Sequence, residues 1–225
     1  MIKLSRRLEK IATFVDNDSS VVDIGCDHAL LDIYLVLNKK DIKVVASDVN
    51  KNALNNALNN IKKYKLTDKI DTVLSNGLES IDVTGLDTII ISGMGTHTMV
   101  GILYNNLSKL KNINTIILQS NNDVDFLRKK VTSIGYYIEQ EALIKDKKII
   151  YTIIKFKKGH KFYSYKELYF GPCLLKENSS LFKEKNKLEL EKLKIIYPMI
   201  PKGHLMYKLK TLRKIKMYTN IIKEK

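Results

Sequence analysis

Val21-Val22-Asp23-Ile24-Gly25-Cys26-Asp27-His28-Ala29 is the most informative stretch of the chain. A short apolar run ends at Gly25, and a helical pattern follows up to about residue 38, as expected for a buried strand that turns into a helix. In open parallel sheets, nucleotide-like ligands bind at such turns. The G-x-G-x-x-G motif of dinucleotide-binding proteins is missing, because Gly25 stands alone. The polar Asp27 and His28 at the turn need solvent or a polar partner.

Strand and helix patterns alternate over residues 1–158. Strands are predicted over 20–24, 43–48, 70–74, 87–92 and 114–119, and helices over 4–15, 29–38, 53–61 and 123–134. Two more strands, 136–144 and 148–157, surround a turn at Asp146-Lys147 and predict a hairpin. The chain is therefore predicted to be an α/β protein. Five parallel strands plus an antiparallel hairpin match the Rossmann-like class I methyltransferase sheet.

The last third of the chain has a different character. Residues 160–225 hold 16 Lys and Arg against 6 Asp and Glu, a net charge of +10, while the whole chain carries +15. Two helices are predicted, over 181–196 and 205–222, with Leu181, Leu188 and Ile195 seven residues apart. We expect two domains, 1–159 and 160–225, the second a basic, coiled-coil-like helical hairpin. Its charge can hold nucleic acid or can be only a solvated lysine face.

Composition excludes several other classes of protein. The chain has 225 residues, and 44% of them are hydrophobic, which is enough for a folded core. No apolar run approaches the ~20 residues of a membrane span, and the N-terminus lacks the features of a secretion signal. The two cysteines imply no disulfide framework. We expect a cytoplasmic, monomeric protein without an obligate protein partner.

Two later strand ends carry residues suited to a nucleoside. Asp48 ends the second strand, about 20 residues beyond Gly25, where an acidic side chain can accept hydrogen bonds from a ribose diol. The alternative is a helix N-cap, which either Asp48 or Asn50 could provide. Asn76-Gly77-Leu78 follows the third strand and can read an adenine edge, or can be an ordinary turn.

The fourth and fifth strand ends are candidates for the substrate side. Ser92-Gly93-Met94-Gly95 forms an open floor with one flexible apolar contact. Gln119-Ser120-Asn121-Asn122 offers amides that can bind a base edge or cap the following helix. No metal site is expected, because the histidines show no ligand spacing. A nucleophilic role for Cys26 is not favoured.

Five motifs together resemble the bacterial tRNA (adenine(22)-N1)-methyltransferase family. They are Leu4-Ser5-Arg6-Arg7-Leu8, Asp23-Ile24-Gly25-Cys26-Asp27-His28-Ala29, Asn76-Gly77-Leu78-Glu79, Ile91-Ser92-Gly93-Met94-Gly95 and Leu118-Gln119-Ser120-Asn121-Asn122. Two positions depart from the family pattern: Thr96 stands where that pattern has glycine, and Ser120 where it has proline.

The resemblance implies S-adenosyl-L-methionine as cofactor, tRNA as partner and transfer of a methyl group to adenine N1. The implied cofactor site comprises Arg7, Asp23, Gly25, Cys26, Asp27, His28, Asp48, Val49, Asn76, Gly77, Leu78, Gly93 and Met94, although Arg7 could also reach the RNA. Gln119, Asn121 and Asn122, with Lys208, Arg213 and Lys214 of the basic hairpin, are the candidate substrate-binding residues.

The chemistry of the reaction limits what catalytic side chains must do. Neutral adenine carries a lone pair on N1, so no general base is required, and alignment of the reactants supplies much of the rate. A carboxylate can stabilise the charge that develops on the ring. Asp27 is the candidate catalytic residue, with His28 orienting it.

Two other functions remain open on the sequence alone. One is a methyltransferase with another RNA, DNA or small-molecule substrate, although the basic C-terminal region disfavours a small molecule and the fourth strand end lacks an N-P-P-Y-like motif. The other is a nucleic-acid-binding module without turnover.

Overall fold

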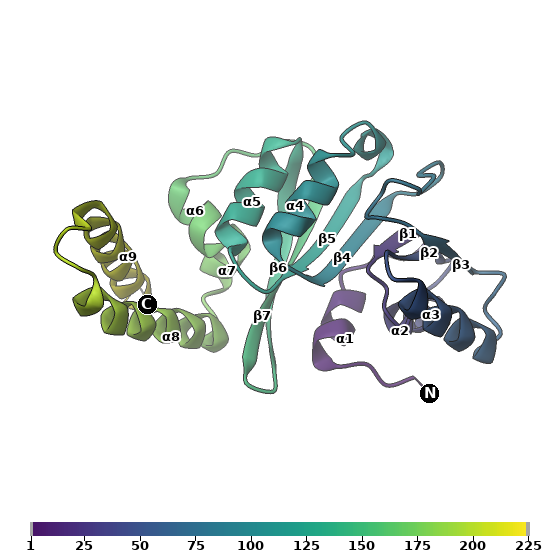
Figure 1. The fold of residues 1–225 in the computed structure, drawn as a ribbon, viewed down its shortest axis with the longest axis horizontal. Coiled ribbons are helices and arrows are strands. Elements are labelled where there is room, and N and C mark those ends of the chain that lie inside the picture. Colours follow the sequence, from purple (N-terminus) through teal and green to yellow (C-terminus); the bar gives the residue numbers. More distant parts are fainter. Residues whose placement is uncertain (1, 224–225) are drawn as a thin grey trace. The chain divides into compact units, whose positions relative to one another are not determined.

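The computed structural model describes residues 2–223 (Figure 1). The chain forms two compact units, the first ending at Leu175 and the second beginning at Lys176. Within the described residues, no helix combines the length and the apolar character that a membrane span requires.

Unit 1 is built on a seven-stranded sheet with the strand order β3-β2-β1-β4-β5-β7-β6. The first five are parallel, and β7 is antiparallel to both β5 and β6, so the predicted sheet is confirmed. The strands are β1 (Ser20–Ile24), β2 (Lys43–Asp48), β3 (Ile70–Leu74), β4 (Thr88–Met94), β5 (Thr115–Ser120), β6 (Tyr136–Asp146) and β7 (Ile149–Lys158). Because β1 and β4 are neighbours while β2 and β3 lie on the other side of β1, the strand order reverses beside β1. Ligands of open α/β sheets bind at such a point.

Helices cover both faces of this sheet (Figure 1). Successive strand residues point to opposite faces, so Val21 and Ile90 belong to one core and Val22 and Ile89 to the other. The first core contains residues of α1, α2 and α3, and the second residues of α4 and α5. These helices are α1 (Arg6–Ala12), α2 (Leu30–Asn38), α3 (Lys51–Lys63), α4 (Thr96–Tyr104) and α5 (Val124–Ser133), with a short 3-10 helix, η1 (Lys109–Asn112).

A buried ion pair explains why unit 1 extends beyond the expected boundary at residues 159 and 160. Arg128 Nε lies 2.6 Å from Glu141 Oε1, and both side chains are almost fully buried. Arg128 also donates to the carbonyl oxygen of Tyr169, and Glu141 accepts from the backbone N–H of Cys173. The pair thus ties two helices that the sequence analysis missed, α6 (Tyr165–Phe170) and α7 (Pro172–Glu177), to the sheet.

Unit 2 contains the two predicted helices, α8 (Ser180–Met199) and α9 (Leu205–Lys223). The expected linker at 197–203 begins later, because α8 continues through Pro198. The expected seam is wrong: Leu188 is 50% and Ile195 60% exposed. The buried positions of α8 are Phe182, Asn186 and Leu190, four residues apart, so the helices pack through a different face.

Candidate functional site

The turn after β1 has a backbone shape that few residues adopt. Gly25, Asp27 and Ala29 all have positive φ, at 82°, 52° and 54°. The N–H groups of Gly25 and Cys26 donate to the carbonyl oxygen of Ser47 on the neighbouring strand. A Cβ on Gly25 would collide with the terminal methyl of Met94, so the ends of β1 and β4 touch here. The turn is therefore a tight backbone cradle at the point where the strand order reverses.

Asp48 forms hydrogen bonds with the backbone of this turn and is not the N-cap of the following helix. Its side-chain oxygens accept from the backbone N–H groups of Asp27, at 3.2 Å, and Asn50, at 2.8 Å. Asn50 is the N-cap of α3. Of the two alternatives for an N-cap, Asn50 is thus the one used. Asp48 joins the ends of β1 and β2, and Val49 beside it is exposed.

Three carboxyl groups lie close enough at this turn to influence one another's pKa: those of Asp23, Asp48 and Asp32. Asp32 was not among the predicted site residues. Burial first, and then the charge of Asp48, raises the pKa of Asp23 to about 7, although the charge of Arg7 acts in the opposite direction. Burial also raises the pKa of Asp32 well above its ordinary value, and the charge of Asp23 adds to this. One oxygen of Asp23 and both of Asp32 have no hydrogen-bond partner among the described residues. The signal that could have identified Asp32 is that it is the one acidic residue in the mostly apolar helix α2.

The thiol of Cys26 shares this environment. Burial, followed by the charges of Asp32, Asp23 and Asp48, raises the pKa of Cys26. A thiol held protonated is a poor nucleophile. Cys26 can contribute backbone atoms to a ligand site here.

The loop after β3 is positioned by contacts with α4 and with Lys109. Asn76 is exposed and donates to Glu79 Oε1, whereas Leu78 lies fully in the core. Gly77 has φ +59°, and a Cβ there would meet Ile102 of α4 at 2.9 Å, so packing on α4 already requires glycine. The ammonium of Lys109 donates to three carbonyl oxygens, those of Leu78, Glu79 and Ile81. Lys109 is a second residue that sequence reasoning missed.

Gln119 connects the ends of β4 and β5 to α1. It is fully buried, and its side-chain oxygen accepts from Arg7 Nη1 and, at 3.1 Å, from the N–H of Gly93. Its amide nitrogen donates to Asn121, which itself donates to the carbonyl oxygen of Gly93. Both ends of the Gln119 amide are thus occupied within the protein. The guanidinium of Arg7 also lies 5.6 Å from the ring centroid of Tyr151 on β7.

Asp27 and His28 are both exposed to solvent at the turn. Asp27 Oδ1 lies 3.5 Å from His28 Nε2, and the side chains are 74% and 48% exposed. Asn60 of α3 donates to the carbonyl oxygen of His28. Asp27 and His28 therefore lie at the mouth of the cradle, while Asn121 and Asn122 are the exposed amides after β5.

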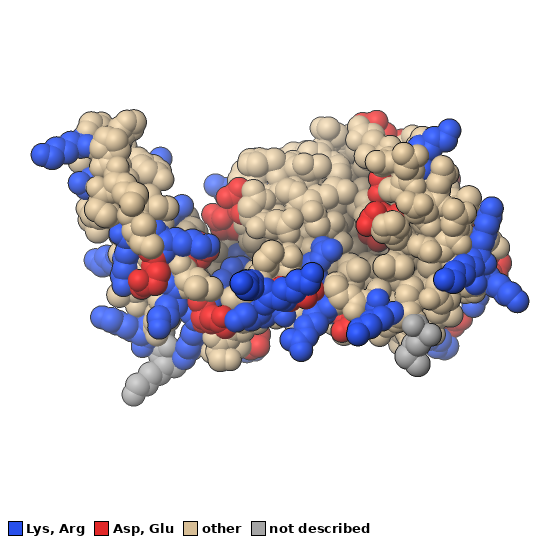
Figure 2. All heavy atoms as spheres, turned by 60° about the horizontal axis from the view of Figure 1, so that its bottom comes forward, with Lys and Arg blue, Asp and Glu red and all other residues tan. Residues whose placement is uncertain are grey.

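The remaining predicted residues belong to unit 2. Arg213 and Lys214 are exposed on α9, whereas Lys208 is half-buried, with its ammonium 5.4 Å from the ring centroid of Tyr197. Figure 2 shows basic side chains over the surface of this hairpin. Over residues 2–223, no three His, Cys, Asp or Glu side chains group in a way that could hold a metal ion.

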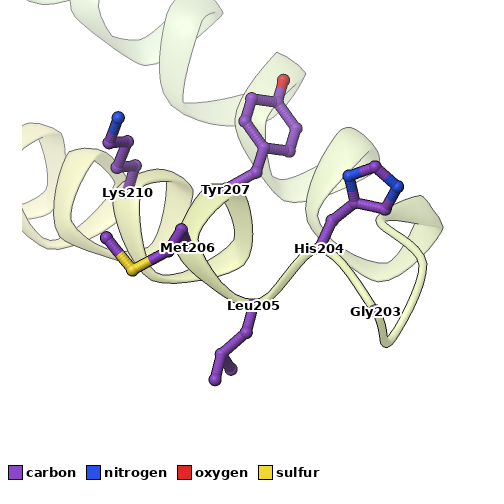
Figure 3. A pocket seen from close by; sticks show the side chains of 6 residues that line it. All are labelled: Gly203, His204, Leu205, Met206, Tyr207 and Lys210. Atoms are coloured by element: carbon purple, nitrogen blue, oxygen red, sulfur yellow. The ribbon is translucent and has the colours of Figure 1, made fainter.

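A shallow cavity of about 450 Å³ lies at the tip of the hairpin, where α9 begins. It is lined by Gly203, His204, Leu205, Met206, Tyr207 and Lys210. Figure 3 shows the rings of His204 and Tyr207 on one side of the backbone and Leu205 pointing away from them. This cavity is formed by residues of unit 2 alone.

The sheet order and the cradle at the end of β1 define a class I methyltransferase, an enzyme that takes its methyl group from S-adenosylmethionine. The particular family follows from sequence. The model of the tRNA (adenine(22)-N(1))-methyltransferase family matches residues 21–222, so the chain belongs to that family. The predicted family and reaction are thereby confirmed.

Individual relatives agree with this assignment. The tRNA (adenine(22)-N(1))-methyltransferase of Bacillus subtilis (strain 168) is 29% identical over 205 residues, which cover 88% of this chain and 86% of the relative. A Streptococcus pneumoniae structure in complex with S-adenosyl-L-methionine is 32% identical, with a TM-score of 0.90 and coverage of 98% and 100%. A structure from M. capricolum with S-adenosyl-homocysteine is 32% identical, with a TM-score of 0.87 and coverage of 97% for both chains.

Proposed function

We propose that the cradle of Gly25, Asp27, Asp48, Gly77 and Met94 binds S-adenosylmethionine in this enzyme. The observation that carries this proposal is the bond from the Asp27 N–H to Asp48, which joins the two strand ends beside the reversal of strand order. Asp48 keeps acceptor capacity for a ribose diol, because a carboxylate accepts up to about four hydrogen bonds.

The chemistry of the site fits this cofactor. S-adenosylmethionine carries a sulfonium and an ammonium group and supplies the methyl group when bound. Asp23 and Asp48 place negative charge under the turn, and the buried Asp23 oxygen without a partner is a ready acceptor. The backbone of Gly25 and Cys26 orients a ligand, and the apolar end of Met94 shields it from water.

The roles on the substrate side follow from exposure. The carboxylate of Asp27 stabilises positive charge that develops on the adenine ring, and His28 orients it at 3.5 Å. Asn121 and Asn122 offer amide groups to the base edge. The buried Gln119 holds Arg7, Gly93 and Asn121 in place instead of contacting the base.

Unit 2 holds the tRNA through its basic surface. Extruding a base from a folded arm costs a few kcal/mol, and phosphate contacts from Arg213, Lys214 and neighbouring lysines offset this cost. His204 and Tyr207 at the tip offer rings on which an unpaired base can stack (Figure 3). We expect the enzyme to act as a cytoplasmic monomer.

The decisive experiment uses two tRNA transcripts, one with adenine and one with guanine at position 22. The protein is incubated with each transcript and S-adenosylmethionine, and the nucleosides are analysed by mass spectrometry. We expect 1-methyladenosine only from the first transcript. Equal methylation of both transcripts would contradict position 22 as the target. Cofactor binding without any methylated product would instead favour a nucleic-acid-binding module without turnover.

Asp27→Asn tests the proposed catalytic role. It should lower the single-turnover rate by about tenfold to a hundredfold, with a smaller effect on cofactor affinity measured by calorimetry. Equal losses in both would make Asp27 a cofactor ligand only. Asp68→Asn is a control, because Asp68 is also exposed but lies before β3.

A further inference from the structure

Two buried hydroxyl groups meet between the start of α4 and the end of β5. Thr96 Oγ1 lies 2.6 Å from Ser120 Oγ, and the residues are 0% and 3% exposed. Because the two hydroxyl groups form one contact, we treat Thr96 and Ser120 as a pair.

The pair holds Asn122. Its carbonyl oxygen lies within hydrogen-bond distance of both hydroxyl groups. Because the two hydroxyls have one proton each, one of them donates to this carbonyl and the other donates either to it or to its partner hydroxyl. The N–H of Asn122 donates to Ser120 Oγ at 3.3 Å. Its side-chain oxygen accepts from the N–H of Thr96 at 3.2 Å. The N-cap of α4, Gly95, has no side chain that could accept from the first turn, so Asn122 does this from another segment.

The neighbouring residue, Asn121, is bound by residues at the ends of β4 and β5. Asn121 accepts from Gln119 at 3.1 Å and donates to the carbonyl oxygen of Gly93 at 3.2 Å. The two amides that face outward after β5 are thus fastened to the end of β4 and to the start of α4. A small shift of this loop would move both amides together.

We infer that Thr96 and Ser120 are positioning residues, which set the place of Asn121 and Asn122 against the target adenine. This inference rests on the proposed function, in which these two amides meet the base. Misplacing a reactant by about 1 Å can cost a hundredfold in rate. Serine leaves the backbone less restricted than proline would, and the contacts of the Ser120 hydroxyl with Thr96 and Asn122 restrain this loop.

The test is a double-mutant cycle in the full-length enzyme with tRNA. Thr96→Val removes the hydroxyl at nearly constant shape, Thr96→Ser restores it, and Ser120→Ala removes its partner. We expect Thr96→Val to lower the single-turnover rate by roughly tenfold, with cofactor affinity within about twofold of the wild type. Thr96→Ser should recover most of the rate, and Ser120→Ala should add little in the Thr96→Val background, because the two groups act as one unit. Thr98→Val, on the exposed side of α4, is the matched control.

Three outcomes would overturn the inference: an unchanged rate in Thr96→Val, losses that multiply in the double variant, or equal losses of rate and thermal stability that Thr96→Ser does not rescue. Asn121→Ala and Asn122→Ala separate this inference from the proposed function. If these two variants methylate tRNA normally, the role proposed for the amides fails. If they are slow while Thr96→Val is normal, only the positioning role fails.

Discussion

Arg7 donates a hydrogen bond to the side-chain oxygen of Gln119, and so joins the leading helix to the end of the fifth strand, 112 residues later. The same oxygen accepts from Gly93, one residue before Met94. Through Gln119, Arg7 is therefore connected to the strand end that carries Met94 of the proposed cofactor site, and its charge lowers the pKa of Asp23.

Replacing Arg7 should weaken cofactor binding. A hydrogen bond from a charged donor contributes about 1.5–3 kcal/mol, so Arg7→Ala should lower the affinity for S-adenosylmethionine by at least about tenfold in calorimetry. The affinity of Arg7→Lys should lie between those of the wild type and Arg7→Ala, since lysine keeps the charge but not the planar geometry of the guanidinium group. Arg6→Ala is the control, because Arg6 is exposed on the same helix. Similar affinities of Arg7→Ala and Arg6→Ala would disprove the supporting role.

Cofactor binding should depend on pH through Asp23. Burial first, and then the charge of Asp48, raises the pKa of this carboxyl to about 7. Because the ionised form attracts a cationic ligand, affinity should increase as the pH rises through about 7. Asp23→Asn should bind more weakly and lose most of this dependence. A wild-type affinity that is constant between about pH 6 and pH 8 would count against the role of Asp23.

The sign is opposite for the stability of the unliganded protein. A carboxyl whose pKa is raised by folding binds its proton more tightly in the folded state. The free energy of unfolding should therefore fall as the pH rises from the ordinary value of 3.8 through about 7. Denaturation of the wild type and Asp23→Asn across this range measures the difference.

The Arg128–Glu141 pair should be needed to keep α6 and α7 on the sheet. Removing one partner of a buried pair costs about 3–5 kcal/mol, while replacing both by apolar groups can be nearly neutral. Glu141→Gln should thus destabilise unit 1 in chemical denaturation, and Arg128→Met combined with Glu141→Leu should recover part of the loss. Hydrogen exchange at residues 165–175 should rise in the single variant. Unchanged exchange there would show that other contacts hold these helices.

The basic hairpin should control the salt dependence of tRNA binding. Changing Lys208, Arg213 and Lys214 to Gln should reduce the slope of log affinity against log salt by roughly 2–3, because each phosphate contact contributes about one unit. Lys62, Lys63 and Lys69, all exposed in unit 1, provide a control triple with the same charge change. If both triples reduce the slope equally, the effect comes from total charge and the hairpin has no special role.

Much of unit 1 could be predicted because its signals are local. The five parallel strands are short and mostly apolar, and each was found within two residues of its observed ends. The Asp146-Lys147 turn predicted the antiparallel pair, and the motifs at the strand ends predicted the cofactor class. In unit 2 the two helices were predicted, but the packing face was not. Apolar residues spaced by seven suggested a seam, whereas Phe182, Asn186 and Leu190 are buried.

The strand-helix alternation, the family and the residues at the strand ends could be read from the sequence, because they depend on periodicity and on short motifs. Which distant residues meet depends on how the helices and strands pack. Asp32 became part of the acidic cluster because α2 lies beneath the turn, and Arg128 reached Glu141 because α5 packs beside β6. Thr96 and Ser120 looked like two unrelated departures from a pattern. They are one contact because β4 and β5 are neighbours in the sheet, and neighbouring strands bring together residues that the sequence separates by an entire helix.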